Sequence, residues 1–594
     1  MSPVARPEAR QRLSTRAGLF LLAVLTLVFF RGVVFGERLF TVDFHLTFQP
    51  LREVLGRALS DGFPGWNPHL SNGVPLAANP LNAAFYPLNW IFRAVPAATG
   101  LTWLTLLHVL FGAVGAFRLA RRQGQFTPGA FTTATVVAFG GVAASATAYS
   151  NLCWSASWLP WLLLGLDRLS RPEPDERPWR SQLLVAGSVL ALSLLGEPFV
   201  LLGGALGGGL LLLETAARER PRPAWRTALP FLWPVALGLV LALPALLAYL
   251  DYAPHSVRGA GFTHEGVTLW SAHPAAFVDI ALPGVYGEPA LQSFDGATGY
   301  WARALVADKG YPLFAGTYVG GLVLALAVIG AATGRGRWLL PTWLGLLALL
   351  ALGRFGPFTW LYGMPGLDAL RYPVKWLVPA LLPLALLAGR GVDRVERTAV
   401  PTGRAPLAIA LGVTILVIAG VSMVVQLPAA LDALAGEAIA ERAPVRAAVL
   451  RATLRGLVPS IVALTLVYFA LVRPAPSPRA ARHRAQWTAA LLALLVGVDL
   501  VQANARLAPT VGPGFYRDVP ALADAIVEDR PPVQRIAVAR PRGVNFVRDP
   551  IYAEQARGQR EALVGYTALA YGLDLAFGPD TEALHPLRYT QLQV

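Results

Sequence analysis

The chain has 594 residues, of which 55% are hydrophobic and only 14% charged, and its mean hydropathy is +0.50. Soluble domains usually carry about 25% charged residues, so this composition excludes a string of ordinary globular domains. The net charge of +15 comes mostly from arginines in short segments between apolar runs, a pattern typical of membrane proteins rather than of nucleic-acid binders. Cys153 is the only cysteine, which excludes an intrachain disulfide and a cysteine-based metal site.

Apolar runs of membrane-spanning length recur along the chain. We predict an all-α polytopic membrane protein with about thirteen transmembrane helices and a small extracytoplasmic α/β segment at its C-terminal end. The first run, 17–36, follows several arginines, but it is long for a signal peptide and no small-residue cleavage site follows, so we interpret it as a retained helix. The predicted spans lie near 17–36, 100–118, 129–149, 152–167, 181–196, 198–213, 228–249, 312–333, 338–353, 374–389, 406–427, 456–472 and 487–505.

The arginines between these spans fall in alternate loops, on the same side as the N-terminus. The positive-inside rule places that side in the cytoplasm. We therefore expect a cytoplasmic N-terminus, with the C-terminus and the loops 40–92, 251–311 and 354–372 outside. The loop 428–455 disagrees, because it lies outside on this count yet carries several arginines; we interpret it as an amphipathic surface helix. The predicted modules are a membrane module at 1–255 with its first outer loop at 36–99, a large outer loop at 256–311, a second membrane module at 312–505 and an outer segment at 506–594.

The segment 40–92 carries what apolar spans exclude: carboxylates, five asparagines and repeated prolines and glycines. It is too polar to cross a bilayer and too aromatic for a solvated linker, so we predict an ordered loop at headgroup depth on the outer surface. In the outer segment 506–594, residues 535–540 alternate as a strand does and 521–528 form a helical pattern, which indicates a small mixed fold.

A few polar residues are left over once topology is explained. Asp43 ends the first span and is a candidate functional carboxylate, although a helix cap or a solvated loop charge would also explain it. Glu197 lies in a very short turn between two apolar runs, where an unpaired acid is costly, so a functional role and simple solvation at the helix end both stay open. Arg354, Arg371 and Lys375 are cations on the predicted outer side, against the topology rule, and such cations suit a phosphate.

A set of short motifs occurs in a fixed order along the chain. They are Asp43 with Pro50, Gly65-Trp66-Asn67-Pro68, Asn72-Gly73-Val74-Pro75 with Asn79, Phe85-Tyr86-Pro87-Leu88, Trp158-Leu159-Pro160, Leu282-Pro283-Gly284, Leu370-Arg371-Tyr372-Pro373-Val374-Lys375, and Asp499-Leu500 with Asn504. Their order resembles that of the YfhO-type bacterial membrane proteins, which belong to the GT-C glycosyltransferases. The likeness covers most of the chain, although this sequence has Val42 where the family usually has glycine before the first-loop aspartate. The resemblance implies a bacterial plasma membrane as the location.

The resemblance implies an enzyme that moves a sugar from a polyprenyl-phosphate donor to an extracytoplasmic glycan, lipid or protein, by an inverting reaction with an outer-loop aspartate as base. Asp43 then takes the base role, with Glu197 as the next acid to test. Arg371, Lys375 and Arg354 would hold the lipid phosphate. The sugar would be bound by Trp66, Asn67, Asn79 and Tyr86, although loop capping also explains the asparagines.

Two other classes of function were weighed against this one. The first is a non-catalytic GT-C-like scaffold or lipid-binding subunit of a cell-envelope complex. The second, a transporter, predicts paired charges near the membrane midplane, whereas the charges here concentrate at the outer boundary. Membrane lipids are expected partners and nucleic acid is not. The resemblance leaves a divalent metal cofactor open, and the short outer segment leaves open a partner subunit at the outer face.

Overall fold

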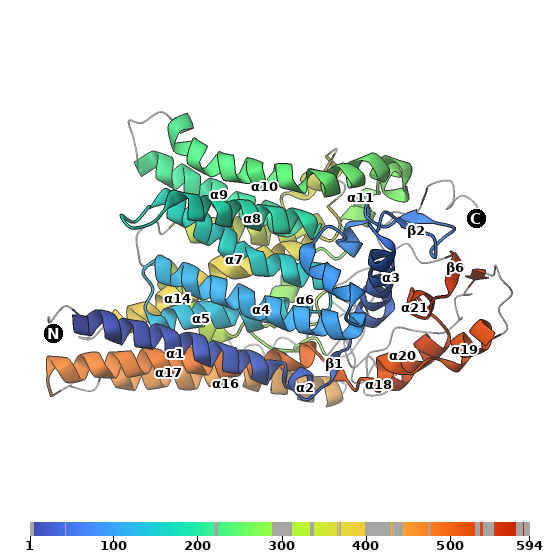
Figure 1. Cartoon of the computed structure of the whole chain (residues 1–594). Helices are drawn as coiled ribbons and strands as arrows, with labels where there is room; N and C mark the ends of the chain where they lie inside the picture. Colours follow the sequence, from blue (N-terminus) through green and yellow to red (C-terminus); the bar gives the residue numbers. More distant parts are fainter. Residues whose placement is uncertain are drawn as a thin grey trace.

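The computed structural model describes residues 5–41, 43–218, 224–287, 312–332, 338–364, 366–367, 370–397, 443–472, 476–528, 535–537 and 552–577, with the single positions 429, 432 and 586. Its long helices lie side by side and form an elongated bundle (Figure 1). The first helix begins at one end of the bundle, and the first outer loop and the C-terminal segment meet at the other end. We refer to these as the N-terminal end and the outer end.

The bundle is built from helices that follow the apolar runs of the sequence. They are α1 (Ala5–Phe29), α4 (Ala97–Arg122), α5 (Thr127–Phe139), α6 (Gly141–Ala146), α7 (Ser150–Ser170), α8 (Pro178–Leu194), α9 (Pro198–Arg218), α10 (Ala224–Tyr252), α12 (Gly321–Ala331), α13 (Leu339–Ala351), α14 (Leu377–Arg397), α16 (Ala443–Val472) and α17 (Pro478–Asn504). Several begin with proline in the first turn, where its missing N–H costs no hydrogen bond.

Six helical stretches of the described residues are long and apolar enough to cross a membrane, which identifies a membrane protein. They are 97–122, 127–146, 198–217, 228–255, 373–397 and 478–507. Shorter apolar helices cover Thr15–Phe29, Gly321–Ala331 and Leu339–Ala351. The total of thirteen spans stays a prediction, and the predicted span 406–427 lies outside the described residues.

Two spans differ from the sequence prediction in a way that the packing explains. The predicted span 129–149 is broken at Gly140, and the amide of Gly141 donates to the carbonyl of Tyr318 at 2.6 Å. The predicted span 312–333 becomes helical only at Gly321, and the residues before it stay non-helical, where Thr317 donates from its amide and its hydroxyl to Asp279. Both departures depend on partners distant in sequence.

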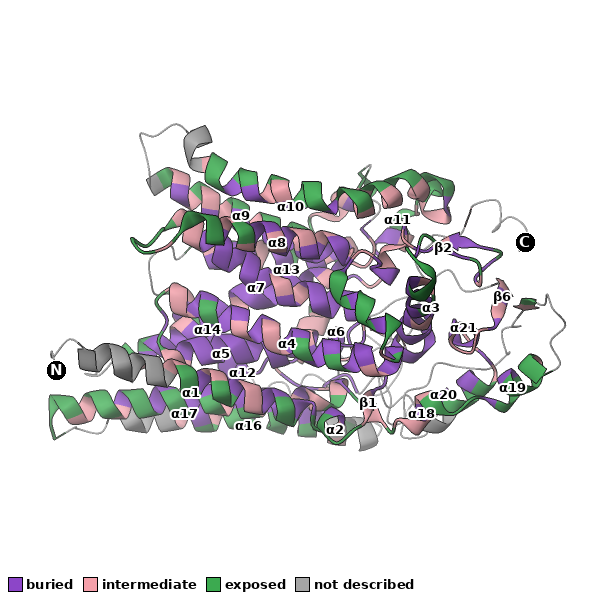
Figure 2. Ribbon diagram, in the orientation of Figure 1, coloured by how far each residue is buried: buried purple, intermediate pink, exposed green. Residues whose placement is uncertain are grey.

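Helix α14 lies at the centre of the bundle and packs against α5, α12, α13 and α17. Its approach to α12 is close because both helices present glycine: a Cβ at Gly330 or Gly391 would overlap a backbone carbonyl of the other helix. Small residues at helix contacts are typical of membrane bundles. Helix α10 lies at the periphery and exposes large apolar side chains along its length (Figure 2), as a lipid-facing helix does.

At the outer end the first outer loop packs on the C-terminal segment. The loop contains α3 (Gln49–Asp61) and the hairpin strands β2 (Trp66–Asn67) and β3 (Val74–Pro75). The C-terminal segment contains α18 (Gly514–Arg517), α19 (Ala521–Glu528), α20 (Tyr552–Glu561), α21 (Thr567–Ala570) and the parallel strands β5 (Arg535–Ala537) and β6 (Asp574–Phe577). Backbone hydrogen bonds of 2.8 Å join Leu575 to His69 and Ser71, and β1 (Arg38–Leu39) pairs antiparallel with β4 (Thr510–Val511).

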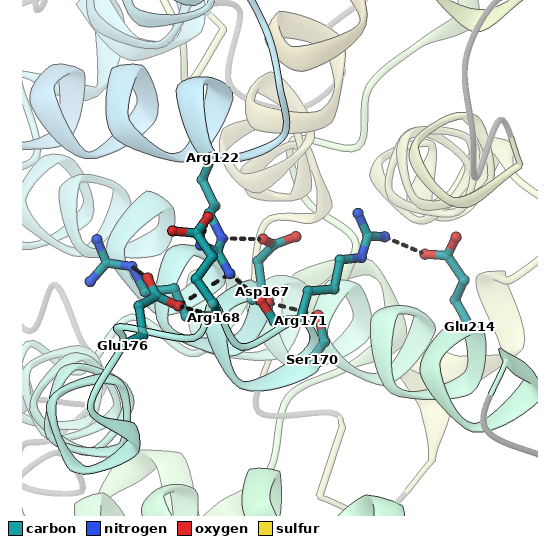
Figure 3. Close-up of polar contacts among 8 residues, drawn as sticks. Arg122, Asp167, Arg168, Ser170, Arg171, Glu176 and Glu214 are labelled. Atoms are coloured by element: carbon teal, nitrogen blue, oxygen red, sulfur yellow. Dashed lines mark hydrogen bonds and ion pairs between the residues drawn. The ribbon is translucent and has the colours of Figure 1, made fainter. Parts of the chain in front are cut away.

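A charged network fastens the N-terminal end of the bundle. Arg122, at the end of α4, contacts Asp167 on α7 at 3.4 Å and Glu176 in the following loop at 3.2 Å, and Arg171 reaches Glu214 on α9 at 3.5 Å (Figure 3). The network ties the carboxyl ends of three helices together. Cations are favourable there because the helix dipole is negative at that end.

Candidate functional site

A cavity of about 520 Å³ opens at the outer end of the bundle. Its walls come from the first outer loop at 77–85, the turn between α8 and α9, the α10 helix and the segment that leads into α14. Leucines from α8, α9 and α10 form an apolar side, while Asn79, Glu197, Arg258, Arg371 and Lys375 bring polar groups to it. An apolar pocket with a few convergent polar groups is the usual form of a ligand site.

Arg371 brings to this cavity a cation that is held by aromatic rings. Its guanidinium lies 4.5 Å from the centre of the Phe262 ring and 4.7 Å from that of Tyr372, so two aromatic faces hold it. Its Nε is buried and has no hydrogen-bond partner among the described residues. A ligand oxygen would satisfy that donor.

Lys375 and Glu197 form an ion pair in the wall of the cavity. The Nζ of Lys375 lies 3.2 Å from one carboxylate oxygen of Glu197 and 3.4 Å from the other. The two side chains are 18% and 12% exposed, so solvent screens this pair less than a surface pair. Gly196, at φ +69°, makes the sharp turn that presents Glu197, and a Cβ there would meet Pro80 of the first outer loop.

A buried hydrogen-bond clamp fixes the wall that carries Glu197. The amide of Asn151, at the start of α7, donates to the carbonyls of Pro80 at 2.9 Å, Leu81 at 3.2 Å and Leu195 at 3.1 Å. Its oxygen accepts from Arg52 at 2.9 Å, and Arg52 also donates to the carbonyl of Leu81 at 3.0 Å. Complete burial lowers the pKa of Arg52 to about 9. The clamp thus joins the first outer loop, α7 and the turn before α9.

The structure brings only some of the predicted site residues together. Asn79, Glu197, Arg371 and Lys375 line the cavity, and Asn79 also caps a short helix by accepting from the amide of Leu81 at 2.9 Å. Asp43 does not line it; this residue is half-buried before the π-helical turn Phe44–Phe48 and makes no capping hydrogen bond to that turn.

The other four predicted residues also lie outside the wall of the cavity. Trp66 is 55% exposed on the outer hairpin, and the side-chain oxygen of Asn67 accepts from the amide of His69. Tyr86 is buried with its hydroxyl 2.8 Å from His108, and burial raises its pKa to about 12. Arg354 donates to the carbonyl of Thr268 at 3.2 Å. Their assignment to sugar or phosphate binding stays a prediction.

Three contributors were missed by sequence reasoning: Arg258 and Tyr249 in the wall of the cavity, and Asn151 in the clamp. Arg258 is a further cation in the predicted outer loop 251–311, and the argument that singled out Arg371 applies to it equally. Asn151 begins an apolar run and gave no such signal. Among the described residues, no group of three or more histidines, cysteines or carboxylates is placed to hold a metal ion.

No family model matches the sequence, and no curated protein sequence matches it. Solved structures with a similar fold include ArnT from Cupriavidus metallidurans bound to undecaprenyl phosphate, at 13% identity and a TM-score of 0.44 over 97% of this chain and 87% of that one. The archaeal oligosaccharyltransferase AglB from Archaeoglobus fulgidus, in complex with an inhibitory peptide and a dolichol-phosphate, aligns at 10% identity and a TM-score of 0.41 over 95% and 64% of the two chains. The arabinofuranosyltransferase AftD from Mycobacteria aligns at 16% identity and a TM-score of 0.38 over 72% and 27%. These neighbours are GT-C glycosyltransferases. Every TM-score is below 0.5 and every identity below 20%, so these likenesses concern the fold alone.

Proposed function

We propose that the protein is a membrane glycosyltransferase that takes a sugar from a polyprenyl-phosphate donor and transfers it to an acceptor outside a bacterial plasma membrane. The observation that supports this function is the outer-end cavity, which combines an apolar wall of membrane helices with the cations Arg371, Lys375 and Arg258. A lipid phosphate has the matching chemistry, with an apolar chain and an anionic head. The YfhO-type resemblance of the sequence motifs agrees with this proposal.

In the proposed reaction a carboxylate base takes the proton of the acceptor hydroxyl, and the oxygen attacks the anomeric carbon. The bond between that carbon and the lipid phosphate breaks, and the phosphate leaves with the electron pair. Arg371 suits the leaving phosphate because its guanidinium is held on two rings with an unsatisfied nitrogen. Lys375 adds a point charge beside it.

The identity of the base separates two versions of this mechanism. The sequence resemblance indicates Asp43 as the base. In that version the acceptor would have to enter from the face of the first outer loop. Glu197 is the only carboxylate among the described residues that line the cavity, but Lys375 holds it. Glu197 can serve as base only if a bound phosphate draws Lys375 away.

A specific observation favours a second candidate, the non-catalytic lipid-binding subunit. The lining carboxylate is already engaged in an ion pair, so the cavity as described can bind a lipid phosphate without offering a released base. This version keeps the cavity and the cations and omits the transfer.

The test uses the full chain purified into lipid nanodiscs. Binding of undecaprenyl phosphate is compared with binding of undecaprenol, which lacks the phosphate. We expect phosphate-dependent binding; equal affinity for the two lipids would remove both candidate functions. Sugar release from a panel of sugar-charged undecaprenyl phosphates then separates the candidates, because the enzyme turns over at least one donor and the binding subunit turns over none.

A further inference from the structure

A second cavity, of about 380 Å³, lies at the N-terminal end of the bundle. It is bounded by the carboxyl-terminal parts of α7, α9 and α14, by the start of α13 and by residues 123–125 after α4. Arg390 in this cavity follows Lys375 in the outer wall by fifteen residues of one largely helical segment, which corresponds to roughly 22 Å along the helix. The two cavities are therefore separate sites.

The carboxylates of this second cavity already have donors. Asp167 contacts Arg122 at 3.4 Å, and Glu214 contacts Arg171 at 3.5 Å (Figure 3). Asp393 accepts the backbone amide of Phe126 through both oxygens at 3.0 Å. Each carboxylate thus has a donor of its own, although all three also lie close enough to Arg390 to interact with its charge.

Arg390 has few hydrogen bonds to the surrounding protein. Its Nη2 reaches the side-chain oxygen of Gln123 only at 3.5 Å, and its Nη1 is buried without a hydrogen-bond partner among the described residues. Arg171, Arg394 and Arg397 line the same cavity, so the four arginines outnumber the three carboxylates. A buried donor without a partner is unfavourable, and an acceptor oxygen in the cavity would offset that cost.

We propose that this cavity is a second, independent anion site that binds a phosphate group through Arg390. The phosphate belongs either to the headgroup of an anionic membrane lipid or to free phosphate. Leu211, Leu339 and Leu340 line one side and would suit the first carbons of an acyl chain. By the arginine topology this end faces the cytoplasm, where basic pockets between helices bind anionic headgroups. The inference does not depend on the proposed glycosyl transfer.

The test measures binding of dioctanoyl phosphatidylglycerol and dioctanoyl phosphatidylcholine to the full chain in detergent, with inorganic phosphate as competitor. We expect the anionic lipid to bind about tenfold more tightly, which corresponds to about 1.4 kcal/mol, and Arg390→Gln to abolish that preference. If millimolar phosphate competes with the lipid, the site recognises the phosphate group alone. If phosphate does not compete, the site requires the lipid.

The control is Arg177→Gln, which replaces an exposed arginine of the adjacent loop that does not line the cavity and should keep the preference for the anionic lipid. If Arg390→Gln does not fold, Arg397→Gln replaces a rim side chain that is 56% exposed and should weaken the preference by a smaller factor. The proposal is wrong if the unaltered protein neither prefers the anionic lipid nor binds phosphate, or if folded Arg390→Gln keeps the preference.

Discussion

Lys375 Nζ lies 3.2 Å from Glu197 Oε2, and this contact joins the segment before α14 to the turn between α8 and α9 across the wall of the outer cavity. The pair leaves Arg371 as the lining cation whose Nε has no partner among the described residues. The two cations that sequence analysis grouped together therefore have different surroundings. Arg371 is available to an anion at once, whereas Lys375 must first leave a carboxylate.

Arg371→Ala should weaken binding of undecaprenyl phosphate. A hydrogen bond between charged groups is typically worth about 1.5–3 kcal/mol, which corresponds to roughly 10- to 150-fold in affinity. Equilibrium binding to the protein in nanodiscs measures the effect. Arg93→Ala, at an exposed arginine of the first outer loop that does not line the cavity, is the control and should leave the affinity unchanged. If both variants bind like the unaltered protein, Arg371 does not contact the phosphate.

Glu197→Gln should act in the opposite direction on binding. Removal of the carboxylate releases Lys375 from its ion pair, so the cavity gains a cation and undecaprenyl phosphate should bind a few-fold more tightly, with a free-energy gain of about 1 kcal/mol. The same assay measures it, with Lys375→Met as the converse variant. If Glu197→Gln abolishes sugar transfer while it strengthens lipid binding, Glu197 is the base. Weaker lipid binding would show that the pair builds the site rather than competes with the ligand.

Asn151→Ala should lower the midpoint of thermal unfolding and weaken binding together. The carbonyl of Leu195 and one nitrogen of Arg52 lose a partner in a fully buried place, whereas the carbonyls of Pro80 and Leu81 keep the donors Ala83 and Arg52. Each group left without a partner costs about 1–3 kcal/mol. Ser157→Ala is the control on the same helix, because the Ser157 hydroxyl bonds only to the carbonyl of Cys153 within α7. An unfolding midpoint equal to that of the control would show that the clamp contributes nothing to stability.

Sequence analysis located the apolar spans because length and hydropathy are local properties. It located Arg371 and Lys375 because cations outside contradict the topology rule, and Glu197 because an acid between two apolar runs is costly. The clamp of Arg52 and Asn151 could not be predicted from the sequence, because it depends on how α3 and α7 are rotated toward each other. The non-helical stretch before Gly321 was missed for a similar reason: its sequence is apolar, and its Thr317 donates to the distant Asp279.

His45 predicts acid sensitivity at the contact between the first outer loop and the C-terminal segment. The ring is fully buried, with Nδ1 donating to the carbonyl of Thr41 at 2.8 Å and Nε2 beside Gln559 of α20, and burial lowers its pKa to about 4. The unfolded chain takes up this proton near pH 6.5, so stability is full above that pH and falls as the pH drops toward 4. The loss is on the order of 3 kcal/mol.

To measure this effect, the protein is held at pH values between 7.5 and 4.5, returned to neutral pH and exposed to a short pulse of trypsin, and cleavage of the C-terminal segment is recorded. The midpoint of thermal unfolding at each pH is measured for comparison. His45→Phe keeps the ring packing against Phe40 and Phe515 without a titrating group, and it should flatten the pH dependence above pH 5. An unchanged pH profile in His45→Phe would assign the acid sensitivity to other groups.

Asp43→Asn tests the base that the sequence resemblance indicates. Asparagine keeps the size and much of the hydrogen bonding of aspartate but cannot accept a proton. Positioned acid–base groups contribute roughly 10²–10⁴-fold to rate, so turnover of an accepted donor should fall by that factor while undecaprenyl phosphate still binds. Asp61→Asn, at an exposed acid of the same loop, is the control and should keep full turnover.

A capping role for Asp43 predicts that Asp43→Asn is fully active, because asparagine is itself a good helix cap. The structure shows no capping hydrogen bond from Asp43 to the turn Phe44–Phe48, so full activity would instead indicate that Asp43 takes no part in the reaction. Glu197, in the wall of the cavity, would then be the remaining candidate base. If neither Asp43→Asn nor Glu197→Gln lowers turnover, neither of these two carboxylates is the base. If the unaltered protein uses no donor yet binds undecaprenyl phosphate, the non-catalytic subunit is the correct function.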